Sequence, residues 1–452
     1  MHSKVQVELD IDCEPQSDLG QRRGTLLGFS ANIMNTIVGA GILGLPYSFA
    51  KVGWATGLVL LLLGVVTTQW SVHLINLVCI RVGGDQLSFG YVAQRVNNWV
   101  PILLDLFVIL MCLVMPIVYL GTAADFLVLV FGYITPNADF DAWYLSRTFF
   151  LTIVFVVCAA PLSLFRKVTI LQYTSGVAML CVLYTVILVL VYSVSGTTEQ
   201  LCASFLKGNN ATMCFGENCC LSETEGSLCC IGKIYAFDGE FKDVLSSVAI
   251  MLVSYGCTPQ VFLAYNDLVN PTATRLDAGV GIALYIVTGL YFVAALGGYF
   301  TYGHVVSDDL LGSYPVNLVC TIARLGIVFL VAVSFPLLFH AARDATVHII
   351  TQIYTAVTKQ SLEPFSKAEK FVFYGVAVGE LALVYVVSLL GISMSVLLSL
   401  NGALTYGMLS FTVPGVFYWI LFKENGLTFH RLTCPLLVVL GTFVMIVNIV
   451  YW

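Results

Sequence analysis

The chain has 452 residues, of which 59% are hydrophobic and 10% are charged, and its formal net charge is −6. A soluble domain carries about 25% charged residues, so the composition excludes a mainly soluble protein and predicts an integral membrane protein. No metal motif, nucleotide-binding glycine loop or Ser/His/Asp set stands out. We therefore expect neither an enzyme nor a nucleic-acid partner.

The first 24 residues are polar and acidic, and Arg22 and Arg23 stand just before the first apolar run. A secretory signal peptide instead has a basic start and an apolar core within its first 15–30 residues, so this N-terminus is not expected to be one. We expect residues 1–24 to form a disordered cytoplasmic tail that precedes a single transporter domain over residues 25–452.

Crossing about 30 Å of hydrocarbon takes roughly 20 apolar residues in a helix. On that measure we expect an all-α protein with eleven transmembrane helices, and for the span at 314–350 an exposed cytoplasmic end from Arg343. The expected spans are 25–50, 54–80, 99–131, 145–165, 168–195, 243–268, 278–303, 314–350, 369–390, 392–421 and 431–452.

The first span contains the segment NTIVGAGILGLP at residues 35–46. Glycine costs a helix about 1 kcal/mol relative to alanine, and proline about 3 kcal/mol. Because irregular backbone is tolerated in a membrane only where it is buried in protein or lines a cavity, we expect a functional break at Gly39–Gly41. The sixth span reads SYGCTP at Ser254–Pro259, which predicts a second break. Glycines and proline also interrupt the tenth span, so a bend is expected there as well.

Most lysines and arginines fall in segments on the side of the N-terminus. The positive-inside rule then makes the N-terminus cytoplasmic, and an odd number of spans makes the C-terminus extracellular or lumenal.

Residues 196–242 form the one long loop, on the outer side. They contain the glycosylation sequon at Asn210 and six of the fourteen cysteines, which are Cys202, Cys214, Cys219, Cys220, Cys229 and Cys230. Cysteines in an oxidising compartment predict disulfides, although six cysteines allow 15 pairings, which the sequence leaves open. Metal binding is the alternative, and the absence of histidine from the loop disfavours it.

Four segments carry a resemblance to a known family. They are Asn35–Pro46, Pro161–Leu164 followed by Arg166, Cys257–Leu268 with Pro259, Tyr265 and Asp267, and Leu400–Ala403. Over residues 25–450 the chain resembles the amino acid/auxin permease superfamily, and within it the sodium-coupled neutral amino acid transporters. The resemblance implies a LeuT-like fold with inverted five-helix repeats, helices 1–5 over 25–195 and helices 6–10 over 243–421, plus an eleventh helix at 431–452.

An amino acid needs donors for its carboxylate and acceptors for its ammonium group. Amides at the start of the half-helix after Gly39–Gly41 suit the carboxylate, because that helix end is positive. Carbonyls freed before this break and around Ser254–Cys257 suit the ammonium group. The alternative is that the glycines only allow close helix packing. The candidate substrate residues are Thr36, Gly39, Ala40, Gly41, Ser254, Tyr255, Cys257 and Thr258.

The resemblance also implies a sodium site between the first and eighth helices, at positions that here are Asn35, Val38, Val331 and Ser334. Thr258 stands where well-known relatives often carry histidine, which removes one titratable group. Sodium and proton coupling both stay open, and no other cofactor is expected.

Ionisable residues within membrane spans receive a functional interpretation first. From helix rise, Asp125 lies at a depth where it could pair with Arg324, and Glu380 is the candidate proton relay. The alternative for each is a structural ion pair or a group that reaches an interface.

The sequence thus predicts a secondary active transporter of neutral amino acids, with sodium as the first coupling ion and protons as the alternative. A transceptor on the same fold is the second class considered. We expect a monomer in a lipid bilayer, by default the plasma membrane, with lysosomal, vacuolar or endosomal membranes as alternatives.

Overall fold

A computed structural model describes residues 24–39, 41–84, 87–97, 99–135, 143–164, 174–195, 233–359 and 366–451. This part of the chain is helical and contains no β-strand, only one isolated bridge between Gly24 and Leu268. Ten helices are long and apolar enough to cross a membrane, and a bent pair near the N-terminus makes up to eleven. The predicted all-helical fold and number of spans are confirmed.

The first half of the described chain begins with a broken span and contains one short surface helix. Its helices are α1 (Leu26–Ile37), α2 (Gly41–Val52), α3 (Trp54–Val82), α4 (Phe89–Val96), α5 (Val100–Ile134), α6 (Arg147–Val154), α7 (Ala160–Leu164) and α8 (Thr174–Val194). A 3-10 turn η1 (Trp143–Leu145) precedes α6, and the π-helix η2 (Phe155–Ala159) joins α6 to α7.

The second half repeats the pattern of a broken helix followed by long ones. Its helices are α10 (Phe241–Ser254), α11 (Thr258–Asp267), α12 (Ala273–Tyr302), α13 (Leu318–Thr358), α14 (Lys367–Leu389), α15 (Met394–Asn401), α16 (Val413–Leu421) and α17 (Phe429–Tyr451). Shorter pieces are η4 (Gly303–Val305), η5 (Leu310–Gly312), the π-helices η6 (Gly402–Tyr406) and η7 (Met408–Thr412), and η8 (Lys423–Asn425).

Both predicted breaks are confirmed. The axes of α1 and α2 differ by 56°, and α10 and α11 are separated by Tyr255–Cys257. The interruption expected in the tenth span takes the form of two π-helices, which are common at functional sites.

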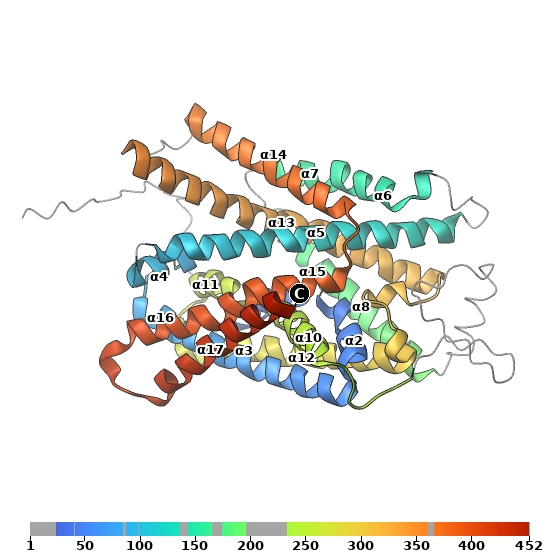
Figure 1. Cartoon of the computed structure of the whole chain (residues 1–452), viewed down its shortest axis with the longest axis horizontal. Coiled ribbons are helices and arrows are strands. Elements are labelled where there is room, and N and C mark those ends of the chain that lie inside the picture. Colours follow the sequence, from blue (N-terminus) through green and yellow to red (C-terminus); the bar gives the residue numbers. More distant parts are fainter. Residues whose placement is uncertain are drawn as a thin grey trace, which may run out of the picture.

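The long helices gather in two groups. In Figure 1, α5, α6, α7, α13 and α14 lie in the upper half, while α2, α3, α10 and α12 lie in the lower half. Within these groups α5 packs on α13, and α12 packs on α1, α2 and α3. Both helix breaks therefore belong to the lower group, and α5 faces them from the other.

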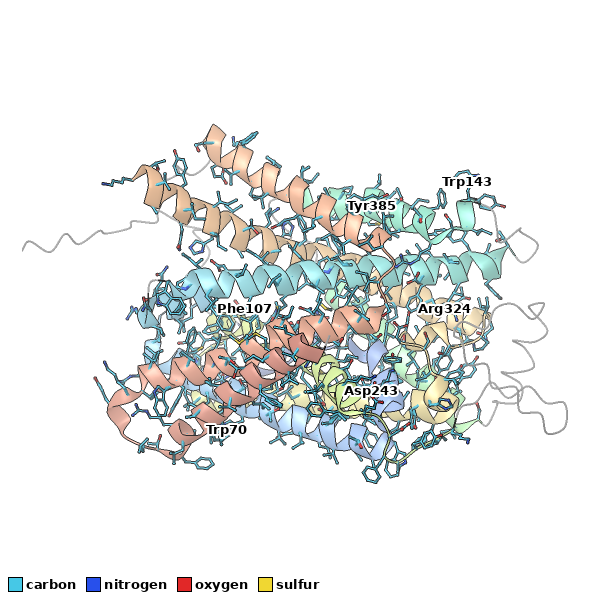
Figure 2. All side chains as sticks on the ribbon, in the orientation of Figure 1. Trp70, Phe107, Trp143, Asp243, Arg324 and Tyr385 are labelled. Atoms are coloured by element: carbon cyan, nitrogen blue, oxygen red, sulfur yellow. The ribbon has the colours of Figure 1, made fainter. Side chains whose placement is uncertain are left out.

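The outer surface of the helices is apolar, as Figure 2 shows by side chains that point away from the ribbon. On α3, Val59, Leu62, Leu63 and Val66 are each more than half exposed. Exposed apolar helix faces of this extent fit a lipid environment, where no water is present to be excluded.

The expectation that the chain is exposed from Arg343 holds only for the last turns of α13, where Ile353, Tyr354 and Val357 are exposed. The Arg343 side chain is buried, lies 4.0 Å from the centroid of the Phe373 ring and donates to the Ser163 carbonyl across 3.1 Å. The reason is that α14 and α7 pack against α13 around Arg343.

Several predictions fall on residues outside the described ranges. These are the tail over residues 1–23, Ala40, the sequon at Asn210, and the loop cysteines Cys202, Cys214, Cys219, Cys220, Cys229 and Cys230.

Candidate functional site

A small cavity of about 50 Å³ lies at the two helix breaks. The α1–α2 break contributes Thr36, Gly39 and Gly41, and the α10–α11 break contributes Gly256 and Pro259. The other described lining residues are Ile37, Met111, Met115, Tyr119, Val253, Gln260, Leu338 and Tyr406. None of these side chains is charged, so a bound zwitterion would meet backbone dipoles and neutral groups.

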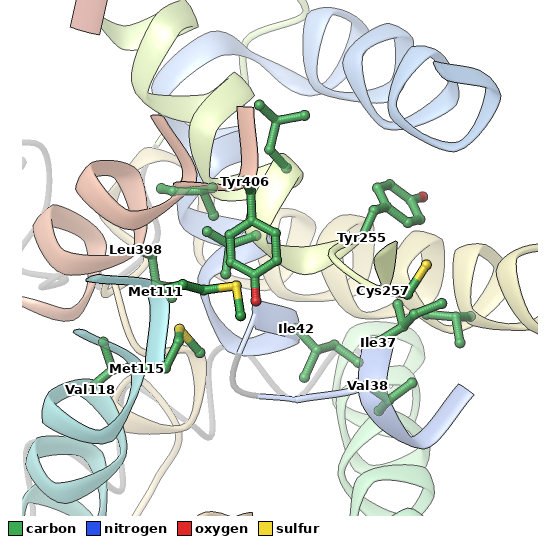
Figure 3. Packing of buried hydrophobic residues seen from close by; sticks show 14 of the residues in the cluster. Ile37, Val38, Ile42, Met111, Met115, Val118, Tyr255, Cys257, Leu398 and Tyr406 are labelled. Atoms are coloured by element: carbon green, nitrogen blue, oxygen red, sulfur yellow. The ribbon is translucent and has the colours of Figure 1, made fainter. Parts of the chain in front are cut away.

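Tyrosine and methionine side chains form the wall opposite the breaks. Figure 3 shows Met111 and Met115 on α5 beside Tyr406, whose hydroxyl points toward the linker between α1 and α2. The hydroxyl of Tyr119 lies 3.4 Å from the position that a Cβ on Gly39 would take. Two tyrosine rings and two flexible thioethers thus enclose the backbone of the breaks, which suits a ligand with an apolar side chain.

One side of α1 next to the cavity carries polar side chains that are not buried. Asn32 is exposed, and Asn35 and Thr36 are partly exposed, whereas α2 is buried apart from Tyr47 and Lys51. Because polar side chains are costly against lipid, this side of α1 fits an aqueous opening. The site is therefore closed at the α2 end and open at the α1 end.

The two breaks touch each other. A Cβ on Gly41 would lie 2.7 Å from the hydroxyl oxygen of Ser254, so glycine is required for this close approach. The hydroxyl of Tyr291 on α12 lies 2.7 Å from the carbonyl oxygen of Ile37 and 2.7 Å from that of Ser254. Ile37 and Ser254 are the last residues of α1 and α10. Carbonyls at these two helix ends are the ones predicted from the sequence to bind the ammonium group of a substrate.

The predicted substrate residues divide into two sets. Thr36, Gly39 and Gly41 line the cavity. Ser254, Tyr255, Cys257 and Thr258 are buried behind it. There the Tyr255 hydroxyl bonds to Thr288 at 3.0 Å and the Thr258 hydroxyl donates to Ser410 at 3.3 Å.

The predicted sodium ligands come from the end of α1, with Asn35 and Val38, and from α13, with Val331 and Ser334. Asn35 and Ser334 are partly exposed, and in the described part of the chain neither side chain has a hydrogen-bond partner. Val38 is buried at the end of α1, and Val331 lines a second, smaller apolar space between α5, α6 and α13. Tyr119 lines both spaces. None of the four predicted ligands is among the described residues that line the first cavity.

The predicted pairing of Asp125 with Arg324 is wrong. Asp125 accepts from Arg147 at the start of α6, with Nε and Oδ1 2.6 Å apart. Arg324 is fully buried and instead donates to the carbonyls of Leu311, Tyr314 and Pro315 at 2.5–3.3 Å. Helix rise predicts only how deep a residue lies in the membrane. The loop between α12 and α13 folds back over Arg324, and the carbonyls of this loop accept the hydrogen bonds of the guanidinium group.

This loop covers the closed end of the site. A Cβ on Gly298 would lie 2.6 Å from Leu310 and 2.8 Å from Pro46, so Leu310 sits against α12 and α2. Asp308 accepts from the backbone amide of Ser395, in the first turn of α15, at 3.3 Å. The loop is thus fastened to α2, α13 and α15 together.

Glu380 lies at the contact of α14 with α13. It is 8% exposed, and Oε1 accepts from the Thr346 hydroxyl at 2.6 Å, while Oε2 has no hydrogen-bond partner in the described part of the chain. A buried carboxyl in this state is a possible site for a proton.

The sequence reasoning missed Tyr119, Tyr291, Tyr406 and the two methionines. Tyr406 carried a signal, since it lies inside the glycine-rich tenth span that was predicted to bend. Met111, Met115 and Tyr119 lie around Pro116 inside α5, and that proline was a second signal. Tyr291 lies in the apolar helix α12, where a tyrosine has no pattern that separates a site from a core.

Comparison with known proteins supports the family and the fold that the sequence predicts. The profile of a family described as "transmembrane amino acid transporter protein" matches residues 22–452. Vacuolar amino acid transporter 6 of Saccharomyces cerevisiae is 27% identical over 320 residues, which are 71% of this chain and 65% of the yeast protein. Sodium-coupled neutral amino acid symporter 2 of Danio rerio is 24% identical over 428 residues, covering 92% of this chain and 79% of that protein.

Two solved structures share the fold. The transporter MhsT in complex with L-phenylalanine superposes with a TM-score of 0.54 at 13% identity, covering 95% of this chain and 99% of that one. Mhp1, a nucleobase-cation-symport-1 family transporter, gives 0.50 at 13% identity, covering 94% and 91%. The predicted LeuT-like fold is confirmed. The family profile spans almost the whole membrane region, and the chain therefore belongs to the transmembrane amino acid transporter family, the amino acid/auxin permeases.

Proposed function

We propose that the protein is a secondary active symporter that carries neutral amino acids by alternating access. The observation that carries this proposal is the cavity between two broken helices with no charged side chain among its described lining residues. Gly41, the first residue of α2, lines the cavity, and the start of a helix suits a carboxylate. Met111, Met115 and Leu338 supply an apolar wall for an uncharged side chain.

We propose that the exposed side of α1 faces the cytoplasm, because the distribution of lysine and arginine favours a cytoplasmic N-terminus. On this proposal the structure would be an inward-open state, with the α12–α13 loop as the closed outer gate. We propose the plasma membrane as the location. The loop over 196–242 would carry the glycan at Asn210 and disulfides, and a mass shift on deglycosylation and on reduction tests both.

We propose sodium as the coupling ion, held by Asn35, Ser334 and the carbonyls of Val38 and Val331. Two observations support it: within the described residues the side chains of Asn35 and Ser334 have no hydrogen-bond partner, and the zebrafish relative is named as sodium-coupled. The test is uptake of a labelled amino acid panel into proteoliposomes, with sodium replaced by choline at constant pH. Asn35→Ala should raise the sodium concentration for half-maximal uptake about tenfold or more, while Asn32→Ala, on the exposed side of the same helix, serves as control. Sodium-independent uptake by the wild type would exclude this coupling.

Proton coupling is the second candidate, and Glu380 favours it. The carboxyl is buried, and one of its oxygens has no hydrogen-bond partner in the described part of the chain. Uptake driven by a pH gradient without sodium, and lost in Glu380→Gln with amino acid exchange retained, would establish it. Uptake that ignores the pH gradient would exclude it.

A further inference from the structure

We propose that Tyr291 is a positioning residue that joins the carbonyl ends of the two broken helices, so that α1 and α10 act as one unit during transport. The part of this inference that concerns transport rests on the proposed function. The junction itself, meaning the hydrogen bonds of Tyr291 to the carbonyl ends of α1 and α10, does not depend on that function.

One hydroxyl group serves two helix ends. Tyr291 is fully buried, and its oxygen lies 2.7 Å from the carbonyls of both Ile37 and Ser254. A phenol has a single proton to donate, so the two acceptors share it. In a continuous helix each carbonyl would receive an amide from the next turn. At the breaks the Ile37 carbonyl accepts from the Gly39 amide at 2.9 Å as well as from Tyr291, and Tyr291 supplies a donor to the Ser254 carbonyl.

The electrostatics of the junction require a donor at this point. The C-terminal end of a helix carries a partial negative charge of about half an electron, and here two such ends converge. Without the Tyr291 hydroxyl, the Ser254 carbonyl would lose this donor and the Ile37 carbonyl would keep the amide of Gly39, so the two helix ends would no longer share a hydrogen bond. Ile37 and Ser254 are themselves buried, with 3% and 1% exposure.

The position of the hydroxyl is set by α12. The Tyr255 ring packs edge-on against the Tyr291 ring, with centroids 5.4 Å apart. The Tyr255 hydroxyl is fixed in turn by Thr288, one turn before Tyr291 on the same helix, at 3.0 Å. The Thr288 hydroxyl also bonds to the Leu284 carbonyl at 2.7 Å. The tyrosine pair therefore anchors both breaks to one continuous 30-residue helix.

A movement of α1 away from α10 must break this shared hydrogen bond. The contact of Gly41 with Ser254 lies beside it, so the linker that borders the cavity is held in place by the same junction. Loss of the hydroxyl should loosen α1 and α10 selectively and disturb the cavity at Gly39 and Gly41, with no direct effect on α14.

The test compares Tyr291→Phe with Tyr285→Phe in lipid nanodiscs by amide hydrogen exchange. Tyr285 lies on the same helix but is 65% exposed, so its hydroxyl serves as a matched control. A buried hydrogen bond that is lost changes an equilibrium by about tenfold. We expect exchange in peptides over 26–39 and 247–257 to rise about tenfold in Tyr291→Phe, with exchange over 367–389 unchanged and the control like the wild type.

Unchanged exchange in Tyr291→Phe, or an equal rise over 367–389, would overturn the proposal. If this variant does not fold, Thr288→Val replaces it, since it releases Tyr255 but leaves the Tyr291 hydroxyl. It should give a smaller rise in the same two segments, and no selective rise there would also overturn the proposal.

The transport arm measures KM and the maximal rate of labelled amino acid uptake. We expect KM to rise about tenfold in Tyr291→Phe and to stay at the wild-type value in Tyr285→Phe. A variant with normal KM that loses only maximal rate would contradict a role in positioning the site. If the wild type carries no amino acid, the proposed function fails, and the exchange measurement still decides the junction.

Discussion

The ring of Tyr406 lies directly over the α-carbon of Gly256. A Cβ added to Gly256 would overlap the carbon atoms of that ring, so the π-helical segment η6 and the α10–α11 break fit together only because residue 256 is glycine. This contact places the Tyr406 hydroxyl in the cavity.

Gly256→Ala should therefore displace Tyr406 and abolish most amino acid binding, because ring and methyl group cannot occupy the same space. Binding is measured by scintillation proximity with the substrate found in the uptake panel. Gly289→Ala is the control, since nothing lies within 4 Å of a Cβ at that position on α12. Normal binding by Gly256→Ala would show that Tyr406 does not define the site.

Arg324 should be important for stability. Its side chain is fully buried and donates to three carbonyls of the α12–α13 loop, and each buried acceptor left without a donor costs about 1–3 kcal/mol. Arg324→Gln should destabilise the protein by about 3 kcal/mol or more. Arg324→Lys should not rescue it, because a single ammonium cannot reproduce the planar fork of guanidinium donors.

Thermal unfolding followed by size-exclusion chromatography measures this effect. Arg95→Gln, on the surface helix α4, is the control and should change stability by less than about 1 kcal/mol. Full rescue by lysine would indicate that charge alone matters at residue 324.

The loop between α12 and α13 should be stabilised by acid. Burial, followed by the neighbouring Asp308 carboxylate, raises the pKa of Asp309 well above the usual 3.8, with Asp125 acting in the same direction and Arg324 against it. The folded protein then holds a proton that the unfolded chain has released. Stability should rise as the pH falls through the raised pKa of Asp309 toward 3.8.

The difference in stability between wild type and Asp309→Asn isolates this contribution. Asparagine stays neutral at every pH. The stability of Asp309→Asn relative to that of the wild type should therefore increase as the pH rises from about 5 to about 8. A difference that is constant across this range would exclude Asp309 as the titrating group.

Substitution of Arg147 should cost more stability than substitution of its ion-pair partner Asp125. Both side chains are partly exposed, and exposed ion pairs contribute about 0.2–1 kcal/mol, so Asp125→Asn should have a small effect. Arg147 also donates to the Ser388 carbonyl at 3.1 Å, and Ser388 is buried. Arg147→Gln should therefore cost about 1–3 kcal/mol. Equal losses in thermal unfolding would show that the bond to Ser388 contributes nothing.

The sequence by itself determined the spans and the breaks. Apolar runs of membrane length predict helices because every backbone amide must be satisfied within the segment, and Gly39, Gly41, Pro46 and Pro259 predict interruptions because their cost to a helix is local. These are short-range effects, which the chain encodes residue by residue. Of the four segments that carried the family resemblance, Asn35–Pro46 is the glycine-rich one that also predicted a break.

Only the tertiary structure decided which partners the buried polar groups take. Arg324 and Asp125 lie at compatible depths, yet they have different partners. Arg324 donates to carbonyls of the folded-back α12–α13 loop, and Asp125 accepts from Arg147 at the start of α6. Tyr291 stands far from both breaks in the sequence and still serves the carbonyls of Ile37 and Ser254. Such pairings depend on helix rotation and loop path, which hydropathy does not specify. The glycines were readable from the sequence, whereas the tyrosines that complete the site were not.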